Sequence, residues 1–293
     1  YVLTSAGSSD IFVAKYDSAG NVVWARGFGN ADSSSGYSID AGLSENIVAT
    51  GSFSGTMSIG EFTLVSAGGF DAFVVKYDGA GNVVRAVSVG GADTDVGTGI
   101  AKDRYVGNSL VTGFYGNTLP PPNTLSNAGS HDVLVAAFSA NLDDGWEWAN
   151  SVGGTGLDSG AAIAVDGAGN SYVTGTAKCP FWFDSVGVFC FPDPTPRTGG
   201  FVAVSDANGF PLSLASAFGQ SSSDFVFPRG IAVDAYKNSY VTGRFDGTAS
   251  FGTTVVTSVG LFDAFVTKLS TGVRCPFDDF DADGIEDQVD TLP

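Results

Sequence analysis

One phrase recurs four times along the chain and limits what the chain can fold into. It reads IAVDGAGNSYVTG at residues 163–175, and related phrases lie at 39–51, 100–113 and 231–243. Each phrase places two runs of β-forming residues on either side of a turn rich in Gly, Asp or Asn, as in a tight hairpin. Their Thr-Gly pairs begin at residues 50, 112, 174 and 242, so the spacing is 62, 62 and 68 residues. A strand-based repeat of this length predicts a modular all-β array.

A second hairpin phrase lies between these copies. It reads DAFVVKYDGAGNVVRAVSV at residues 71–89, with relatives at 10–28, 132–152 and 201–218 and a first half at 263–270. One unit therefore has a first, second, third and fourth strand, and a longer loop of variable content separates the second strand from the third. Repeated units of four antiparallel strands are typical of β-propeller blades. We expect the compact, apolar first strands to line the propeller axis.

The number of units leaves the closure of the propeller open. Three units have all four strands, at about 37–90, 97–153 and 159–219. A fourth, at 228–270, has three strands, and residues 10–28 supply an isolated third and fourth strand, so the two ends offer five strands for completing one blade. The sequence predicts about five blades, or part of a longer propeller, over residues 1–273, followed by a separate segment at 274–293.

Charge excludes several classes of partner. The chain has 13 basic and 31 acidic residues, a formal net charge of −18, and 27 of the acids are Asp. Such a surface repels nucleic acid and anionic membranes, and we expect neither as a partner. The sequence contains no run of about 18 apolar residues, so no membrane-spanning segment is predicted. The chain begins at Tyr1 without Met, which suggests a processed or excerpted product.

The hairpin phrases as a set resemble the bacterial β-propeller repeats called SBBP repeats. The resemblance covers roughly residues 1–270 and implies an all-β propeller of four-stranded antiparallel blades. Two departures stand out, because Gly42 replaces the turn Asp of the other copies and Gly199-Gly200 replaces the Asp before a third strand. We expect these to change local turn hydrogen bonds and to leave the fold intact.

The segment after the propeller has the pattern of a calcium loop. It reads DFDADGIEDQVD at residues 279–290, and carboxylates at alternate positions before a Gly suit a hard cation with oxygen ligands. The predicted Ca²⁺ ligands are Asp279, Asp281, Asp283, the Ile285 carbonyl, Asp287 and Asp290. With Cys275-Pro276 before it and Leu292 where a Cys is expected, the segment resembles a thrombospondin type 3 repeat, which implies calcium in an extracellular protein. The alternative is an acidic tail without an ion.

The loop after the third Thr-Gly pair departs most from the repeat. Cys179 and Cys190 bracket it, and we predict a disulfide between them, because closing a loop of this size stabilises by roughly 3 kcal/mol in the chain-entropy model. Cys275 then has no partner within the chain and is either free or paired with a segment outside it.

Aromatic residues are concentrated in the same loop, and two explanations stay open for them. The first is a local core that covers the edge of a blade. The second is a partner-binding surface for a protein or glycan, because exposed aromatic side chains often anchor interfaces. The residues concerned are Phe181, Trp182 and Phe183.

No catalytic residue is predicted. His131 is the only histidine, so neither a multi-histidine metal site nor a Ser-His-Asp site is expected. Asp143, Asp144 and Glu147 are interpreted as a solvated loop rather than a glycosidase pair. Further acids near the blade loops are interpreted as turn caps in preference to cation ligands. They are Asp32, Asp93, Asp95, Asp158 and Asp224.

These features favour a non-enzymatic, secreted or cell-surface bacterial propeller with a structural, adhesion or assembly role, stabilised by Ca²⁺. Its expected partners are a protein or glycan at the cell surface, or further copies of the chain. The alternatives are an extracellular polysaccharide-active enzyme and a calcium-dependent carbohydrate-binding module, since propellers perform all of these functions. Two carboxylates facing one polar cavity favour the enzyme, and a flat aromatic patch or paired strand edges favour binding or assembly.

Overall fold

Every regular element that the structure describes is a β-strand. The computed structural model describes residues 1–42, 46–120, 124–142, 145–189 and 197–270, and the predicted all-β class is confirmed for them. The strands are β1 (Ile11–Tyr16), β2 (Val22–Phe28), β3 (Ser34–Ala41), β4 (Ile47–Phe53), β5 (Thr56–Ile59), β6 (Phe62–Val65), β7 (Asp71–Tyr77), β8 (Val83–Val89), β9 (Val96–Lys102), β10 (Ser109–Leu119), β11 (Leu125–Phe138), β12 (Trp146–Gly154), β13 (Ser159–Val165), β14 (Ser171–Lys178), β15 (Phe181–Phe183), β16 (Val186–Val188), β17 (Thr198–Ser205), β18 (Pro211–Gly219), β19 (Val226–Val233), β20 (Ser239–Phe245), β21 (Thr248–Phe251), β22 (Thr254–Thr257) and β23 (Asp263–Leu269).

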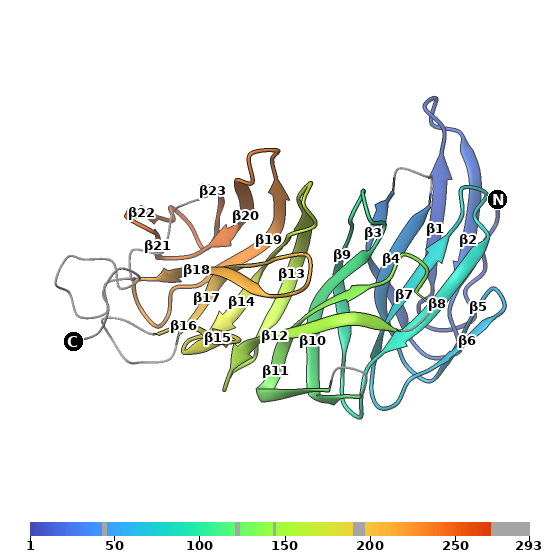
Figure 1. The fold of residues 1–293 in the computed structure, drawn as a ribbon, viewed down its shortest axis with the longest axis horizontal. Helices are drawn as coiled ribbons and strands as arrows, with labels where there is room; N and C mark the ends of the chain where they lie inside the picture. The colour runs from blue at the N-terminus through green and yellow to red at the C-terminus, as the bar shows by residue number, and fades with distance from the viewer. Residues whose placement is uncertain (43–45, 121–123, 143–144, 190–196, 271–293) are drawn as a thin grey trace.

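The strands form four successive antiparallel blades of a β-propeller. The first blade has the order β3-β4-β7-β8, the second β9-β10-β11-β12 and the third β13-β14-β17-β18, while the fourth has only β19-β20-β23 among the described residues. In Figure 1 the blades follow one another along the long axis of the molecule. The predicted assignment of first to fourth strands is therefore confirmed.

The two ends of the described chain do not share a blade. Strands β1 and β2 form a separate hairpin, and β19, β20 and β23 form another sheet. Figure 1 shows the hairpin and the fourth blade at opposite ends of the molecule. The five strands at the ends thus stay in two sheets, and the described residues form four blades flanked by one hairpin.

Hairpins inserted between second and third strands connect neighbouring blades. Strand β15 of the third blade pairs with β12 of the second, placing Phe183 opposite Val152. Strand β21 of the fourth blade pairs in the same way with β18 of the third, placing Phe251 opposite Ala217. Because each insertion extends the sheet of the preceding blade, two sheets have six strands rather than four.

The repeated Thr-Gly pair has a packing role in each blade. The Thr174 hydroxyl donates a 2.7 Å hydrogen bond to the Phe201 carbonyl of the third strand, and Thr50, Thr112 and Thr242 make the equivalent bonds. A Cβ added at Gly175 would collide with the Ser159 carbonyl oxygen of the first strand. The pair therefore brings three strands close together, because the glycine leaves room that no other residue leaves.

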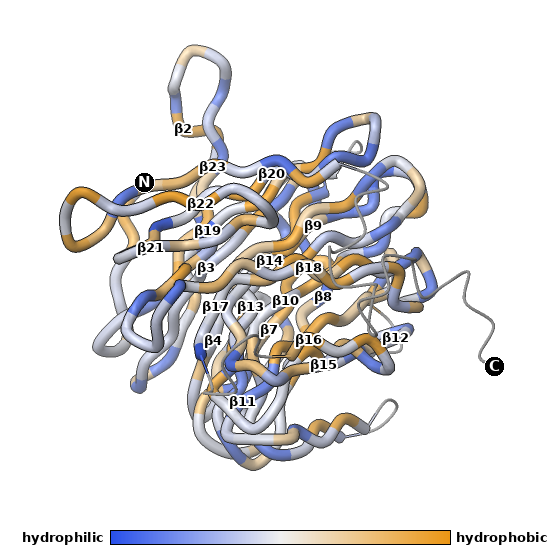
Figure 2. The backbone as a smooth tube through the Cα atoms, turned by 90° about the vertical axis from the view of Figure 1, so that its left-hand side faces the viewer, coloured by the Kyte–Doolittle hydropathy of each residue, from blue (hydrophilic) through white to orange (hydrophobic). Residues whose placement is uncertain are grey.

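The turns use one repeated hydrogen-bond pattern. At residues 166–170, Asp166 Oδ1 accepts from the backbone NH groups of Ala168 and Asn170, and Asn170 Nδ2 donates to Asp166 Oδ2. Gly169 has φ of 81°, a conformation that favours glycine. Figure 2 shows hydrophobic stretches within strands and many hydrophilic connecting turns.

The two departures from the repeat leave the strands intact. The Gly42 NH still donates to the Asn46 carbonyl at 2.9 Å, and β3 pairs with β4. Strand β17 runs over Thr198–Ser205 although it begins with Gly199 and Gly200 in place of the Asp. This agrees with the expectation that the substitutions affect local bonds and not the fold. Within the described ranges, no helix is long and apolar enough to span a membrane.

Candidate functional site

The first strands of all four blades line one central cavity. It measures about 740 Å³, and residues of β3, β9, β13 and β19 form its walls. This confirms that the compact first strands surround the axis. The residues lining it are Ile39, Asp40, Ile100, Ala101, Lys102, Arg104, Tyr105, Ile163, Ala164, Val165, Asp166, Gly167, Ile231, Ala232, Val233, Asp234 and Ala235.

Neighbouring first strands are joined by side chains across the walls of the cavity. Asp40 Oδ2 accepts a 2.8 Å hydrogen bond from the Lys102 backbone NH, and Ser38 Oγ accepts one of 3.2 Å from the Ile100 NH. Thr98 Oγ1 donates to the Gly160 carbonyl at 2.7 Å. The first two contacts occupy backbone NH groups of β9 and the third occupies a carbonyl of β13, so these walls of the cavity are already hydrogen-bonded.

Two carboxylates in the cavity are used by their own turns. Besides its three turn bonds, Asp166 accepts from the Tyr172 hydroxyl at 3.2 Å and lies 3.9 Å from Lys237 Nζ. Burial alone would raise the pKa of Asp166, but the hydrogen bonds from Asn170 and Ala168 lower it below its ordinary value. Both carboxylate oxygens therefore have fixed partners and the group is held ionised.

Asp234 repeats this arrangement in the fourth blade. Asn238 donates from its side chain and its backbone NH, and Tyr236 NH and the Tyr240 hydroxyl donate as well. The side-chain bond from Asn238 is the main cause of its lowered pKa. A carboxylate held ionised by four donors is a poor general acid, because it carries no proton at neutral pH.

Two exposed tyrosines stand on the turns beside the cavity. Tyr105 is 78% exposed and Tyr236 is 82% exposed. Asp103 Oδ1 accepts from the Tyr105 NH at 2.8 Å, and Asp234 Oδ1 accepts from the Tyr236 NH at 2.9 Å. Neither tyrosine is among the candidate residues predicted from the sequence. Comparison of the turn at 234–238 with the Ala-containing turn at 166–170 is the signal that identifies Tyr236.

Two acids before first strands cap loops where the blades join. Asp95 accepts from the NH groups of Gly91 and Gly116, and Asp158 accepts from those of Gly154 and Lys178. Burial raises the pKa of each to about 6. The interpretation as turn caps is thus confirmed for these two.

The other acids interpreted as caps are less buried. Asp224 Oδ2 accepts from the NH groups of Ser221 and Thr248, which again is capping. Asp32 and Asp93 make no such carboxylate bond to a backbone NH in the described contacts. Within the described ranges, no group of three or more His, Cys, Asp or Glu side chains is placed to hold a metal ion.

The aromatic loop divides into buried and exposed residues. Phe181 and Phe183 are 0% and 1% exposed, and both belong to the core between the second and third blades. Of the two explanations left open for the loop, these two side chains fit the local core and not a partner-binding surface, because they pack inward from opposite ends of the three-residue strand β15. Trp182, between them, points outward, is 38% exposed and contacts Phe189 edge to face.

His131 lies at a blade joint and not in the central cavity. It pairs with Gly116 in the β10–β11 ladder, and its ring centroid is 5.0 Å from that of Phe114. Its carbonyl accepts from the Asp158 NH at 2.9 Å. These contacts give it a place in the packing of the second blade.

Several predicted residues lie outside the described ranges. They include all six calcium ligands, Cys190, Cys275, Asp143 and Asp144. The calcium site and the Cys179–Cys190 bond stay predictions, although Cys179 is 1% exposed within the core. Glu147 is described, and it accepts a 2.6 Å hydrogen bond from Asn108 Nδ2.

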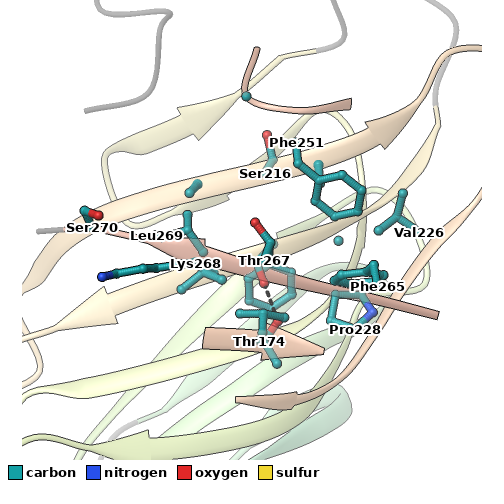
Figure 3. A pocket seen from close by; sticks show the side chains of 17 residues that line it. Thr174, Ser216, Val226, Pro228, Phe251, Phe265, Thr267, Lys268, Leu269 and Ser270 are labelled. Carbon is teal, nitrogen blue, oxygen red and sulfur yellow. Dashed lines mark hydrogen bonds between the residues drawn. The ribbon is translucent and has the colours of Figure 1, made fainter. Parts of the chain in front are cut away.

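A smaller apolar cavity lies between the third and fourth blades. It measures about 180 Å³, and Phe201, Val226, Phe251 and Phe265 contribute to its walls. Figure 3 shows Thr267, Lys268 and Leu269 of β23 along one side of it. It lies where β23 has no fourth strand beside it in the described part of the chain.

Comparison with known proteins agrees with the fold. Residues 148–181 match the model of the SBBP family, described as a beta-propeller repeat. The matched residues run from β12 through β13 and β14 to the start of β15. The match supports the repeat family from the fourth strand of the second blade to the first two strands of the third, and the repeated strand order extends the same architecture to the other blades.

Two curated proteins are similar to parts of the chain. One is the regulatory protein FlaEY of Caulobacter vibrioides, 30% identical over 139 residues, which cover 46% of this chain and 14% of that protein. The other is the uncharacterized WD repeat-containing protein L264 of Acanthamoeba polyphaga mimivirus, 27% identical over 151 residues, which cover 47% of this chain and 11% of that protein. The similarity thus spans a small share of either relative.

Proposed function

We propose that the chain is a non-enzymatic, secreted or cell-surface β-propeller that binds partners in adhesion or assembly. The observation that carries this proposal is the state of Asp166 and Asp234 in the central cavity. Their oxygens accept hydrogen bonds from their own turns, and their pKa values are lowered. These two cavity carboxylates are therefore held by their own turns, while the turns around them present exposed side chains.

Location and binding are tested on cells that produce the protein. A membrane-impermeant biotin reagent should label the chain on intact cells or in the medium, and beads coated with the purified chain should retain such cells. Labelling only after lysis would contradict the proposed location. Beads that retain no more cells than beads coated with albumin would contradict the adhesion role.

An assay for polysaccharide cleavage distinguishes a binding protein from an enzyme. Incubated with extracellular polysaccharides, it should release no new reducing ends, and His131→Ala should change neither this result nor cell retention. Release of reducing ends that disappears in an Asp166→Asn, Asp234→Asn double variant would establish the polysaccharide-active enzyme instead. FlaEY is named a regulatory protein, which is a reason to test protein partners on the same beads.

We also propose that the segment at 274–293 binds Ca²⁺ through the ligands given above. The support is the spacing of its carboxylates around Gly284. Calorimetry should detect Ca²⁺ binding to the full chain, and the Asp281→Ala, Asp283→Ala double variant should lose it. An Asp32→Ala, Asp93→Ala variant is the matched control, since it also removes two acids. Unchanged binding in the first variant would refute the site.

A further inference from the structure

The turn that carries Tyr236 does not need an aromatic residue. The five-residue turn at 166–170 has Ala168 at the equivalent position and makes the same three bonds between its Asp and Asn. Asp234 and Asn238 reproduce these bonds around Tyr236, whose side chain is 82% exposed. Since the same turn bonds form around Ala168, they do not require an aromatic ring at residue 236.

Tyr105 stands in a related position on the second blade. The Asp103 carboxylate fixes its backbone NH and that of Val106, while the side chain is 78% exposed. A Cβ built at Gly167 of the third blade would lie 3.6 Å from the Tyr105 ring, so the ring lies beside the neighbouring turn. Tyr105 lines the cavity, and Tyr236 follows Asp234 and Ala235, which also line it, so the turns that carry the two tyrosines flank the third blade.

Polar groups of both signs lie at the same cavity. Arg104, Asp40 and Asp234 line the cavity, and Lys237 reaches across from the fourth blade to Asp166 of the third at 3.9 Å. Exposed aromatic rings beside fixed donors and acceptors suit a ligand with apolar C–H faces and many hydroxyl groups. That combination is the chemistry of a sugar.

Two observations narrow the class of ligand. A peptide that adds as a strand needs free backbone groups, but on β9 the NH groups of Ile100 and Lys102 already donate to side chains of β3. The net charge of −18 repels acidic sugars. We propose that the end of the central cavity binds a neutral oligosaccharide, with Tyr105 and Tyr236 stacking on its rings. This proposal rests on the proposed binding function and assigns a site to it.

Titration calorimetry on the full chain tests the site with defined probes. The probes are the hexasaccharides of cellulose, xylan, mannan and amylose, with hexagalacturonate as the acidic comparison. At least one neutral probe should bind, and each of Tyr105→Ala and Tyr236→Ala should weaken it by about tenfold, the loss typical of an interface anchor. The corresponding Phe variants should stay within about threefold because they keep the stacking face. Tyr16→Ala is the matched control, as Tyr16 is 59% exposed on β1.

Three results would overturn the site. They are absence of binding by every neutral probe at millimolar concentration, binding that survives the double Ala variant, and equal loss in Tyr16→Ala. A peptide that binds through Tyr105 and Tyr236 without competition from any sugar would also overturn it. Cell retention by beads is measured on the same variants. Retention without sugar binding refutes this site and leaves the proposed function standing.

Discussion

Strands β7 and β23 have closely similar sequences and very different surroundings. They read DAFVVKY and DAFVTKL, and every residue of β7 is buried, whereas only Phe265 is buried in β23. Val74 and Val266 occupy equivalent positions but are 0% and 78% exposed. Strand β7 lies between β4 and β8, and β23 has only β20 beside it in the described residues. The same strand sequence thus acquires its burial from neighbouring strands and blades.

The largest difference is expected when the two equivalent valines are each replaced by Asp. Val74→Asp should lower the free energy of unfolding by about 3–5 kcal/mol, since it buries a charge without a partner, and Val266→Asp should change it by less than about 0.5 kcal/mol. Denaturant midpoints measure both values. Equal losses would show that β23 is as enclosed as β7.

The buried acids before the first strands should make the stability of the protein depend on pH. Asp95 and Asp158 have folded-state pKa values of about 6, above the ordinary value of an Asp in an unfolded chain. The folded protein therefore binds more protons than the unfolded chain between about pH 4 and 6, and the contribution of these acids to stability falls as pH rises through that window. The effect is on the order of 2 kcal/mol for each.

Unfolding curves from pH 4 to 8 compare the wild type with an Asp95→Asn, Asp158→Asn variant. The stability difference, wild type minus variant, should fall with rising pH and level off above about pH 6. Asp224→Asn is the control, because Asp224 also caps a loop but is less buried. Burial tends to raise the pKa of Asp224, but hydrogen bonds from Ser221 and Thr248 lower it below its ordinary value. For Asp224→Asn, the stability difference between wild type and variant should instead become smaller as the pH falls toward the ordinary pKa of an Asp. The same slope in both variants would contradict the comparison.

The smallest expected difference concerns the Thr-Gly pair. Thr174→Val removes a buried 2.7 Å hydrogen bond to Phe201 and should cost about 1–1.5 kcal/mol. Thr242→Val removes the equivalent 2.9 Å bond to the Phe265 carbonyl. Because Thr242 is exposed and this bond is only partly buried, the loss should be about half as large. Denaturant unfolding measures the two losses, and a larger loss for Thr242 would reverse the proposed order of burial.

Much of the fold could be predicted because the repeat carries its own local rules. The Asp-x-Ala-Gly-Asn turns define the hairpins, and the Thr-Gly spacing defines the units. The candidate site was predicted in part: the first strands surround the axis as expected, but Tyr105 and Tyr236 were not identified as candidates. Both turns have a recognisable Asp, yet only the structure shows that the two tyrosines lie on turns around one cavity.

The sequence alone determined the strands, the turns and their order in a unit, because backbone geometry and turn chemistry depend on residues close together in the chain. Tertiary structure decided which copies of a phrase are buried, that Phe181 and Phe183 face a core while Trp182 does not, and that insertions pair with the preceding blade. Burial and sheet extension depend on segments far apart in sequence. The local sequence therefore specifies where each strand and turn forms, but the neighbouring blades determine how much of each strand is exposed to solvent.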